Sequence, residues 1–204
     1  MQPFLKHYEG CMRPRMHNFF DPFDVSQLDN SNLANYTDLN LKIANKINEV
    51  RQLYPSLTMV WVNGDHLMML PHYVRTKFEK ANIGFYFHSA FPASSIFATF
   101  PNRNELIHSL LCCNIIGFHL FEYARNFLNT CHRLYGAHYQ FGEGGAMAVI
   151  WQGRAIQVSV KHIGVDEDFV TMMRSTHEYR LSEKRFKEEF KVIAKLASQN
   201  QMQP

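Results

Sequence analysis

Apolar and polar residues follow two periods along the chain, and these predict helices and strands in turn. In residues 36–53 apolar side chains recur every three or four positions, as on one face of an amphipathic helix. Residues 57–62 and 83–87 are instead nearly continuous apolar runs, which are typical of strands buried on both faces of a parallel sheet. The run at 57–62 is therefore expected to be a central strand rather than an edge strand.

The same alternation continues toward the middle of the chain. Strands that alternate with helices predict βαβ units with right-handed crossovers. The fold class expected is thus α/β, a Rossmann-like parallel sheet flanked by helices. The further elements predicted are helices over 66–81, 102–113 and 120–135, and a strand over 115–118.

After Gly136 the pattern changes to that of a β-hairpin. Residues 147–151 and 154–161 flank the two-residue turn Gln152-Gly153, and apolar and polar side chains alternate in the second of these strands. Ser182 is expected to be the N-cap of a final helix, and residues 198–204 are expected to fray. No linker interrupts the chain, so residues 1–204 are expected to form a single domain.

Composition narrows the class of protein. Of the 204 residues, 46% are hydrophobic and 19% are charged, which suits a globular domain with a core. The net charge is +3, and Lys and Arg are dispersed, so a nucleic-acid partner is not expected. The richest apolar stretch, residues 106–121, is interrupted by polar side chains and is too short to cross a bilayer. With no secretory signal pattern in residues 1–15, a cytoplasmic protein without membrane contact is expected.

Metal and disulfide chemistry also find no support in the sequence. The cysteines form no CxxC pair, and two of them lie together in an apolar helix end, where cysteine acts as a small hydrophobe. The eleven histidines show no ligand spacing with carboxylates beside them. We therefore expect no disulfide framework and no metal. The four cysteines are Cys11, Cys112, Cys113 and Cys131.

Candidate ligand-binding residues stand directly after the predicted strands. In an open parallel sheet, ligands bind beyond the carboxyl ends of the strands. The residues found there are Asn63-Gly64-Asp65-His66, then His88-Ser89, and then His119. From its position, His88 fits either a ligand-binding or a structural role.

Three blocks of sequence in this order carry more specific information. They are VWVNGDHLMMLP at 60–71, IGFYFHSAFPASSIFATFP at 83–101 and IIGFHLFEYARNFL at 115–128, followed by the hairpin and HIGVD. Together they resemble the N-terminal Rossmann-like domain of trehalose-6-phosphate synthases, which are retaining glycosyltransferases of the two-domain GT-B type. The resemblance covers about 17–166, and 167–204 are expected to form C-terminal helices and the frayed tail.

The resemblance implies transfer of glucose from UDP-glucose to glucose 6-phosphate, without a metal or other cofactor. In the family, the N-terminal domain holds the acceptor sugar phosphate, and the C-terminal domain holds most of the nucleotide sugar. His88 matches the family histidine that contacts the donor sugar, and it is the candidate catalytic residue.

The acceptor positions depart from the family pattern. The family carboxylate that binds the acceptor sugar falls on Gly64, and its neighbour Asp65 is expected to cap the following helix rather than replace that carboxylate. Asn18 stands at a family tyrosine and Leu33 at a family tryptophan. The resemblance therefore implies weak recognition of glucose 6-phosphate and UDP-glucose.

Three functions remain open. The first is a truncated synthase-like protein, inactive alone, with a regulatory or structural role in trehalose biosynthesis. The second is one half of a split glycosyltransferase that needs a chain supplying the UDP-binding C-terminal domain, or a full-length synthase, as partner. The third is a domain that has kept its core and lost all ligand binding.

Overall fold

The computed structural model describes residues 8, 12–16, 33–100, 102–162 and 164–200. Its chain divides into two compact units, Met1–His162 and Ile163–Pro204, which we describe separately. The first unit contains the sheet and most of the helices, and the second contains the last two helices.

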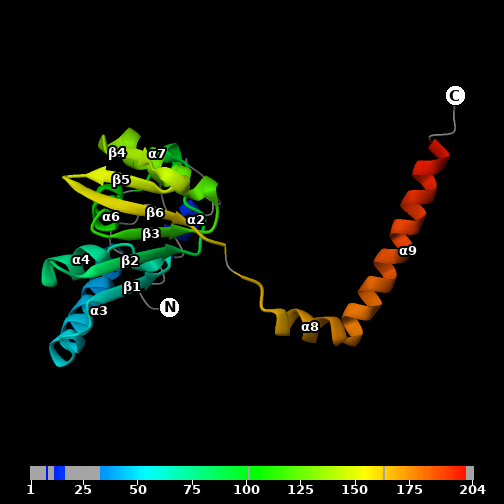
Figure 1. Ribbon diagram of the computed structural model, residues 1–204, viewed down its shortest axis with the longest axis horizontal. Coiled ribbons are helices and arrows are strands. Elements are labelled where there is room, and N and C mark those ends of the chain that lie inside the picture. Colours follow the sequence, from blue (N-terminus) through cyan, green and yellow to red (C-terminus); the bar gives the residue numbers. More distant parts are fainter. Residues whose placement is uncertain (1–7, 9–11, 17–32, 101, 163, 201–204) are drawn as a thin grey trace. The chain divides into compact units, whose positions relative to one another are not determined.

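A six-stranded mixed sheet organises the first unit, with strand order β1-β2-β3-β6-β5-β4 (Figure 1). β1, β2, β3 and β6 are parallel, whereas β5 pairs antiparallel with both β6 and β4. The expected α/β fold and the hairpin are confirmed, and β6 of the hairpin extends the parallel part of the sheet. The strands are β1 (Met59–Asn63), β2 (Asn82–Phe87), β3 (Ile115–Phe118), β4 (His138–Phe141), β5 (Met147–Trp151) and β6 (Arg154–Val160).

One expectation about the sheet is wrong. The apolar run at 57–62 forms β1, which lies at an edge of the sheet in the described part of the chain and not at its centre. Val62 is buried, but Met59 and Trp61 are exposed. A continuous apolar run shows that a strand has apolar surroundings, yet it does not show whether a second strand pairs with it.

The helices of the first unit follow the predicted order with changed boundaries. The helix expected at 66–81 divides into a short 3₁₀ turn and a shorter α-helix, because Pro71 begins the regular part near its N-terminus. The sequence pattern missed the short α5. The helices are α2 (Arg13–Met16), α3 (Leu33–Leu53), η4 (Asp65–Leu67), α4 (Leu70–Lys77), α5 (Ser94–Phe97), α6 (Arg103–Leu110), α7 (Phe121–Tyr135) and η5 (Glu143–Gly145).

The two faces of the sheet differ in their side chains. One face carries fully buried aromatic and branched residues, among them Phe85, Phe87 and Phe118, and the rings of Phe87 and Phe118 stack with centroids 5.2 Å apart. On the other face, glycines leave room for aromatic rings. A Cβ atom at Gly117 would lie 2.4 Å from the Tyr86 ring, so this glycine allows Tyr86 to lie flat across β3.

The second unit consists of α8 (Glu167–Ser175) and α9 (His177–Asn200). The Asp166 carboxylate caps α8 by accepting hydrogen bonds from two backbone amides. α9 begins five residues before Ser182, so the expected N-cap at Ser182 is wrong. The helix also continues to Asn200, past the point where fraying was expected, and residues 201–204 lie outside the described residues. No described helix is long and apolar enough to span a membrane.

Candidate functional site

The polar residues predicted at the strand ends do come together. β1, β2 and β3 are parallel and in register, so their carboxyl ends meet at one edge of the sheet. Asn63, the last residue of β1, contacts His88 after β2, at 3.2 Å between Oδ1 and Nε2. His88 in turn lies beside His119 after β3, with ring centroids 5.5 Å apart. This cluster, Asn63, Tyr86, His88 and His119, is called the strand-end cluster below.

Hydrogen bonds fix the tautomer of His88. The Oδ1 atom of Asn63 can only accept hydrogen bonds, and it receives one from Nε1 of Trp61 at 3.3 Å. The second, from His88, requires a proton on Nε2 of the imidazole. Neutral His88 therefore keeps the lone pair of Nδ1, and the exposed side chain can offer this acceptor to a ligand hydroxyl.

His119 has the opposite tautomer. The Tyr86 hydroxyl donates its single proton to the carbonyl oxygen of Lys161. Its 2.8 Å contact with Nδ1 of His119 therefore places the imidazole proton on Nδ1. Burial, and then the neighbouring His88, hold the pKa of His119 below its ordinary value of 6.5. Neutral His119 is thus the form that the fold stabilises.

This lowered pKa predicts a pH dependence of stability. Below the ordinary pKa the unfolded chain takes up a proton at His119 before the folded protein does, so stability falls as pH falls from about 7 through the folded pKa. We expect the free energy of unfolding, measured with urea, to fall less between pH 7 and pH 5 in His119→Gln than in the natural chain. His138→Gln, at an exposed histidine on β4, is the control and should keep the full loss. Equal losses in all three proteins would contradict the assignment.

Asp65 is buried instead of open to a ligand. Only 4% of the residue is exposed, and its carboxylate accepts hydrogen bonds from the hydroxyls of Tyr8 at 2.9 Å and Ser89 at 3.1 Å. The expected N-cap role is wrong, because η4 begins at Asp65 and Gly64 occupies the cap position without a side-chain bond. The carboxylate joins the loop after β1 to the loop after β2.

Two polar residues of α3, Tyr36 and Asn40, form hydrogen bonds with the same loop. The buried Tyr36 hydroxyl donates to the backbone carbonyl of Asp65 at 3.0 Å and accepts from the amide of Met68 at 3.1 Å. Burial raises the pKa of Tyr36 well above its ordinary value. Nδ2 of Asn40 donates to the carbonyls of Tyr36 and His66. These contacts fix the backbone of residues 65–68 and keep Asp65 in its buried position.

Gly64 has a backbone conformation that suits glycine. Its φ is +88° and its ψ is 147°, a region that residues with a side chain rarely adopt. A Cβ atom there would lie 2.6 Å from the imidazole of His66. The amide of Gly64 also donates to the carbonyl of Tyr86 and continues the ladder between β1 and β2. The conformation of this loop therefore requires a residue without a side chain at position 64.

Comparison with known proteins defines the family. The sequence profile of glycosyltransferase family 20 matches residues 4–203. The chain belongs to glycosyltransferase family 20. It is 34% identical over 191 residues to the probable alpha,alpha-trehalose-phosphate synthase [UDP-forming] 11 of Arabidopsis thaliana, covering 92% of this chain and 21% of that protein. Synthase 5 of the same plant is 36% identical over 168 residues, or 79% of this chain and 19% of its own length. The chain thus spans about a fifth of these relatives.

Solved structures of similar proteins share the fold. A synthase from Burkholderia xenovorans, solved in complex with glucose-6-phosphate, superimposes with a TM-score of 0.71 at 22% identity, over 90% of this chain and 42% of that one. The N-terminal domain of a trehalose-6-phosphate phosphatase from Candida albicans gives a TM-score of 0.71 at 26% identity, over 90% and 37% of the two chains. The architecture is that of the N-terminal half of the GT-B synthases.

The remaining candidate residues of this family 20 protein lie apart from the strand-end cluster or outside the structure. Leu33 begins α3, and its half-buried side chain packs on the hydrophobic core. Asn18 lies outside the described residues. Sequence reasoning missed Tyr8 and Tyr86, since neither follows a strand end. Among the described residues, no three His, Cys, Asp or Glu side chains form a group that could hold a metal.

Proposed function

We propose that this family 20 chain acts in trehalose metabolism as a synthase-like binding domain that does not transfer glucose by itself. The observation that carries the proposal is the loop after β1. Gly64 stands where the family resemblance places the acceptor carboxylate, and the carboxylate of Asp65 is already bound by Tyr8 and Ser89. Within this loop, a sugar hydroxyl therefore has no open carboxylate acceptor to replace the one that Gly64 lacks.

The polar groups left for a ligand belong to the strand-end cluster. His88 offers Nδ1 as an acceptor, and the resemblance assigns this position to the donor sugar. A site with so few hydrogen bonds should bind weakly, with a dissociation constant on the order of 1 mM. The likeness to the N-terminal domain of a trehalose-6-phosphate phosphatase supports a role outside glucose transfer. No metal is required in this proposal.

The imidazole signals of His88 and His119 provide the test in solution. NMR titration with UDP-glucose should shift the His88 signals weakly, and His88→Ala should remove the effect of UDP-glucose on the His119 signals. Titration with glucose 6-phosphate should give smaller shifts still. Glucose 6-phosphate binding in the micromolar range would contradict the loss of the acceptor site. The absence of any shift with UDP-glucose would favour a domain that has lost all ligand binding.

A split transferase is the second candidate, and the retention of His88 at an exposed strand end favours it. The chain covers 42% of the Burkholderia synthase, and in this candidate the UDP-binding half comes from a partner polypeptide. Adding the separately produced C-terminal half of a family synthase should then produce trehalose 6-phosphate. Under our leading proposal the mixture stays inactive, because Gly64 leaves the acceptor site without its carboxylate.

A further inference from the structure

Among the described residues, no strand pairs with the outer edge of β1. The amide of Asn82 donates to the carbonyl of Thr58 at 2.8 Å, and the amide of Gly64 donates to the carbonyl of Tyr86 at 3.0 Å. In a parallel ladder every second residue of a strand bonds to the same neighbour. The even-numbered residues of β1 therefore face β2. The amides and carbonyls of Met59, Trp61 and Asn63 point away from the sheet.

In the part of the chain that the structure describes, β1 carries no charge, proline or bulge that would protect this edge against pairing. Natural edge strands are short, or carry charges, proline or bulges that block an added strand. β1 has the sequence MVWVN and pairs in regular register with β2 over its whole length. Met59 is 61% exposed and Trp61 is 49% exposed. The residues that carry the free backbone groups thus also expose large apolar side chains.

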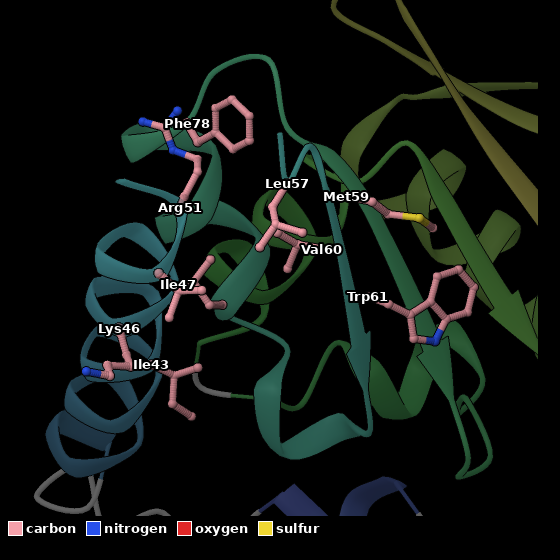
Figure 2. Close-up of a pocket in the computed structure, with 10 residues that line it drawn as sticks. Ile43, Lys46, Ile47, Arg51, Leu57, Met59, Val60, Trp61 and Phe78 are labelled. Atoms are coloured by element: carbon pink, nitrogen blue, oxygen red, sulfur yellow. The ribbon is translucent and has the colours of Figure 1, made fainter. Parts of the chain in front are cut away.

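An apolar groove of about 430 Å³ lies beside this edge, between α3 and β1. Figure 2 shows Ile43 and Ile47 on the α3 side of this groove, with Leu57 and Val60 opposite them. A strand added beside β1 would send every second side chain toward α3. The groove would hold these side chains. Its lining residues are Ile43, Lys46, Ile47, Val50, Arg51, Leu57, Met59, Val60, Trp61 and Phe78.

The groove also contains a cation, Arg51, that no described carboxylate neutralises. The guanidinium of Arg51 lies 4.2 Å from the ring centroid of Phe78, and its Nε is buried without a hydrogen-bond acceptor. Among the described residues no carboxylate forms an ion pair with Arg51, whereas Lys46 is already paired with Glu49. An acidic side chain on the occupant would complement Arg51.

We propose that the β1 edge is a docking site for an extended segment of a partner polypeptide, which adds to the sheet as a further strand. Its backbone would bond to Met59, Trp61 and Asn63, its alternate apolar side chains would fill the groove, and an acidic residue would face Arg51. This is the strand-addition mode of peptide recognition, in which backbone bonds give affinity and pockets give specificity.

Short capped peptides of alternating valine and threonine, with glutamate at one end or the other, are suitable probes. Backbone amide exchange of Met59, Trp61 and Asn63 should be fast in the free protein, and at least one peptide should slow it at least tenfold. Peptides with serine in place of valine should not. Slow exchange in the free protein, or no effect of either valine peptide, would overturn the proposal.

Met59→Pro removes an outward amide and leaves the ladder to β2 intact, so it should weaken binding at least tenfold without unfolding the protein. Met59→Leu is the matched control and should bind as the natural chain does. Arg51→Gln should weaken the binding of the peptides that contain glutamate. It should leave the binding of peptides with glutamine in place of glutamate unchanged. Equal binding to Met59→Pro would refute strand addition. Dimerisation in sedimentation experiments that Met59→Pro abolishes would replace the proposed occupant by a second copy of β1.

Discussion

Replacement of Asp65 by alanine is expected to lower the free energy of unfolding by about 3 kcal/mol. The substitution removes the acceptor of the hydroxyls of Tyr8 and Ser89 and leaves both donors without it at a largely buried position. At a site of such low exposure, the loss of an acceptor costs more than an average hydrogen bond contributes, because water replaces the carboxylate only in part. Urea unfolding of the two proteins at neutral pH measures the difference.

Ser89→Ala is the matched control for this experiment. It removes one donor and leaves the carboxylate bound to Tyr8. We therefore expect the free energy of unfolding to fall by only about 1 kcal/mol. If Asp65→Ala were as stable as the natural chain, the carboxylate would contribute nothing to the fold. It would then be available for a ligand, contrary to the proposed function.

Gly64→Asp restores a carboxylate at the family position, and we expect it to lower the free energy of unfolding by about 2 kcal/mol without improving glucose 6-phosphate binding. The cost arises from the positive φ of Gly64 and from the His66 ring, which occupies the place of a Cβ atom. Urea unfolding and calorimetric titration measure the two effects.

Gly64→Ala separates strain from charge. It introduces the same Cβ without a carboxylate, so the two variants should be equally destabilised and should give equal heats with glucose 6-phosphate. Binding that appears only in Gly64→Asp would mean that the acceptor site has kept its shape. The loss of activity would then depend on this one side chain.

The central strands could be predicted from the sequence because their burial determines their composition. β2 and β3 have strand neighbours on both sides, and their apolar runs ended within one residue of the observed strands. The edge position of β1 could not be predicted in this way. An apolar run reports what packs above and below a strand, whereas pairing depends on segments far away in the sequence.

The site was predicted only in part, for a similar reason. Parallel strands in register bring Asn63, His88 and His119 to one edge, so their proximity followed from the order of the elements. The partners of Asp65 did not follow. Tyr8 is 57 residues away in sequence, and its contact depends on tertiary packing that no local pattern records. The start of α9 was missed because serine is also tolerated in the interior of a helix, so the residue type of Ser182 does not by itself mark an N-terminus.

Product formation is the most direct test of the proposed function. The purified chain is incubated with UDP-glucose and glucose 6-phosphate, and trehalose 6-phosphate is measured by mass spectrometry, with a family synthase as positive control. We predict no product above that of the heat-denatured chain. Steady formation of trehalose 6-phosphate that disappears in His88→Ala would contradict the account, because residues 1–204 would then contain a working transferase site.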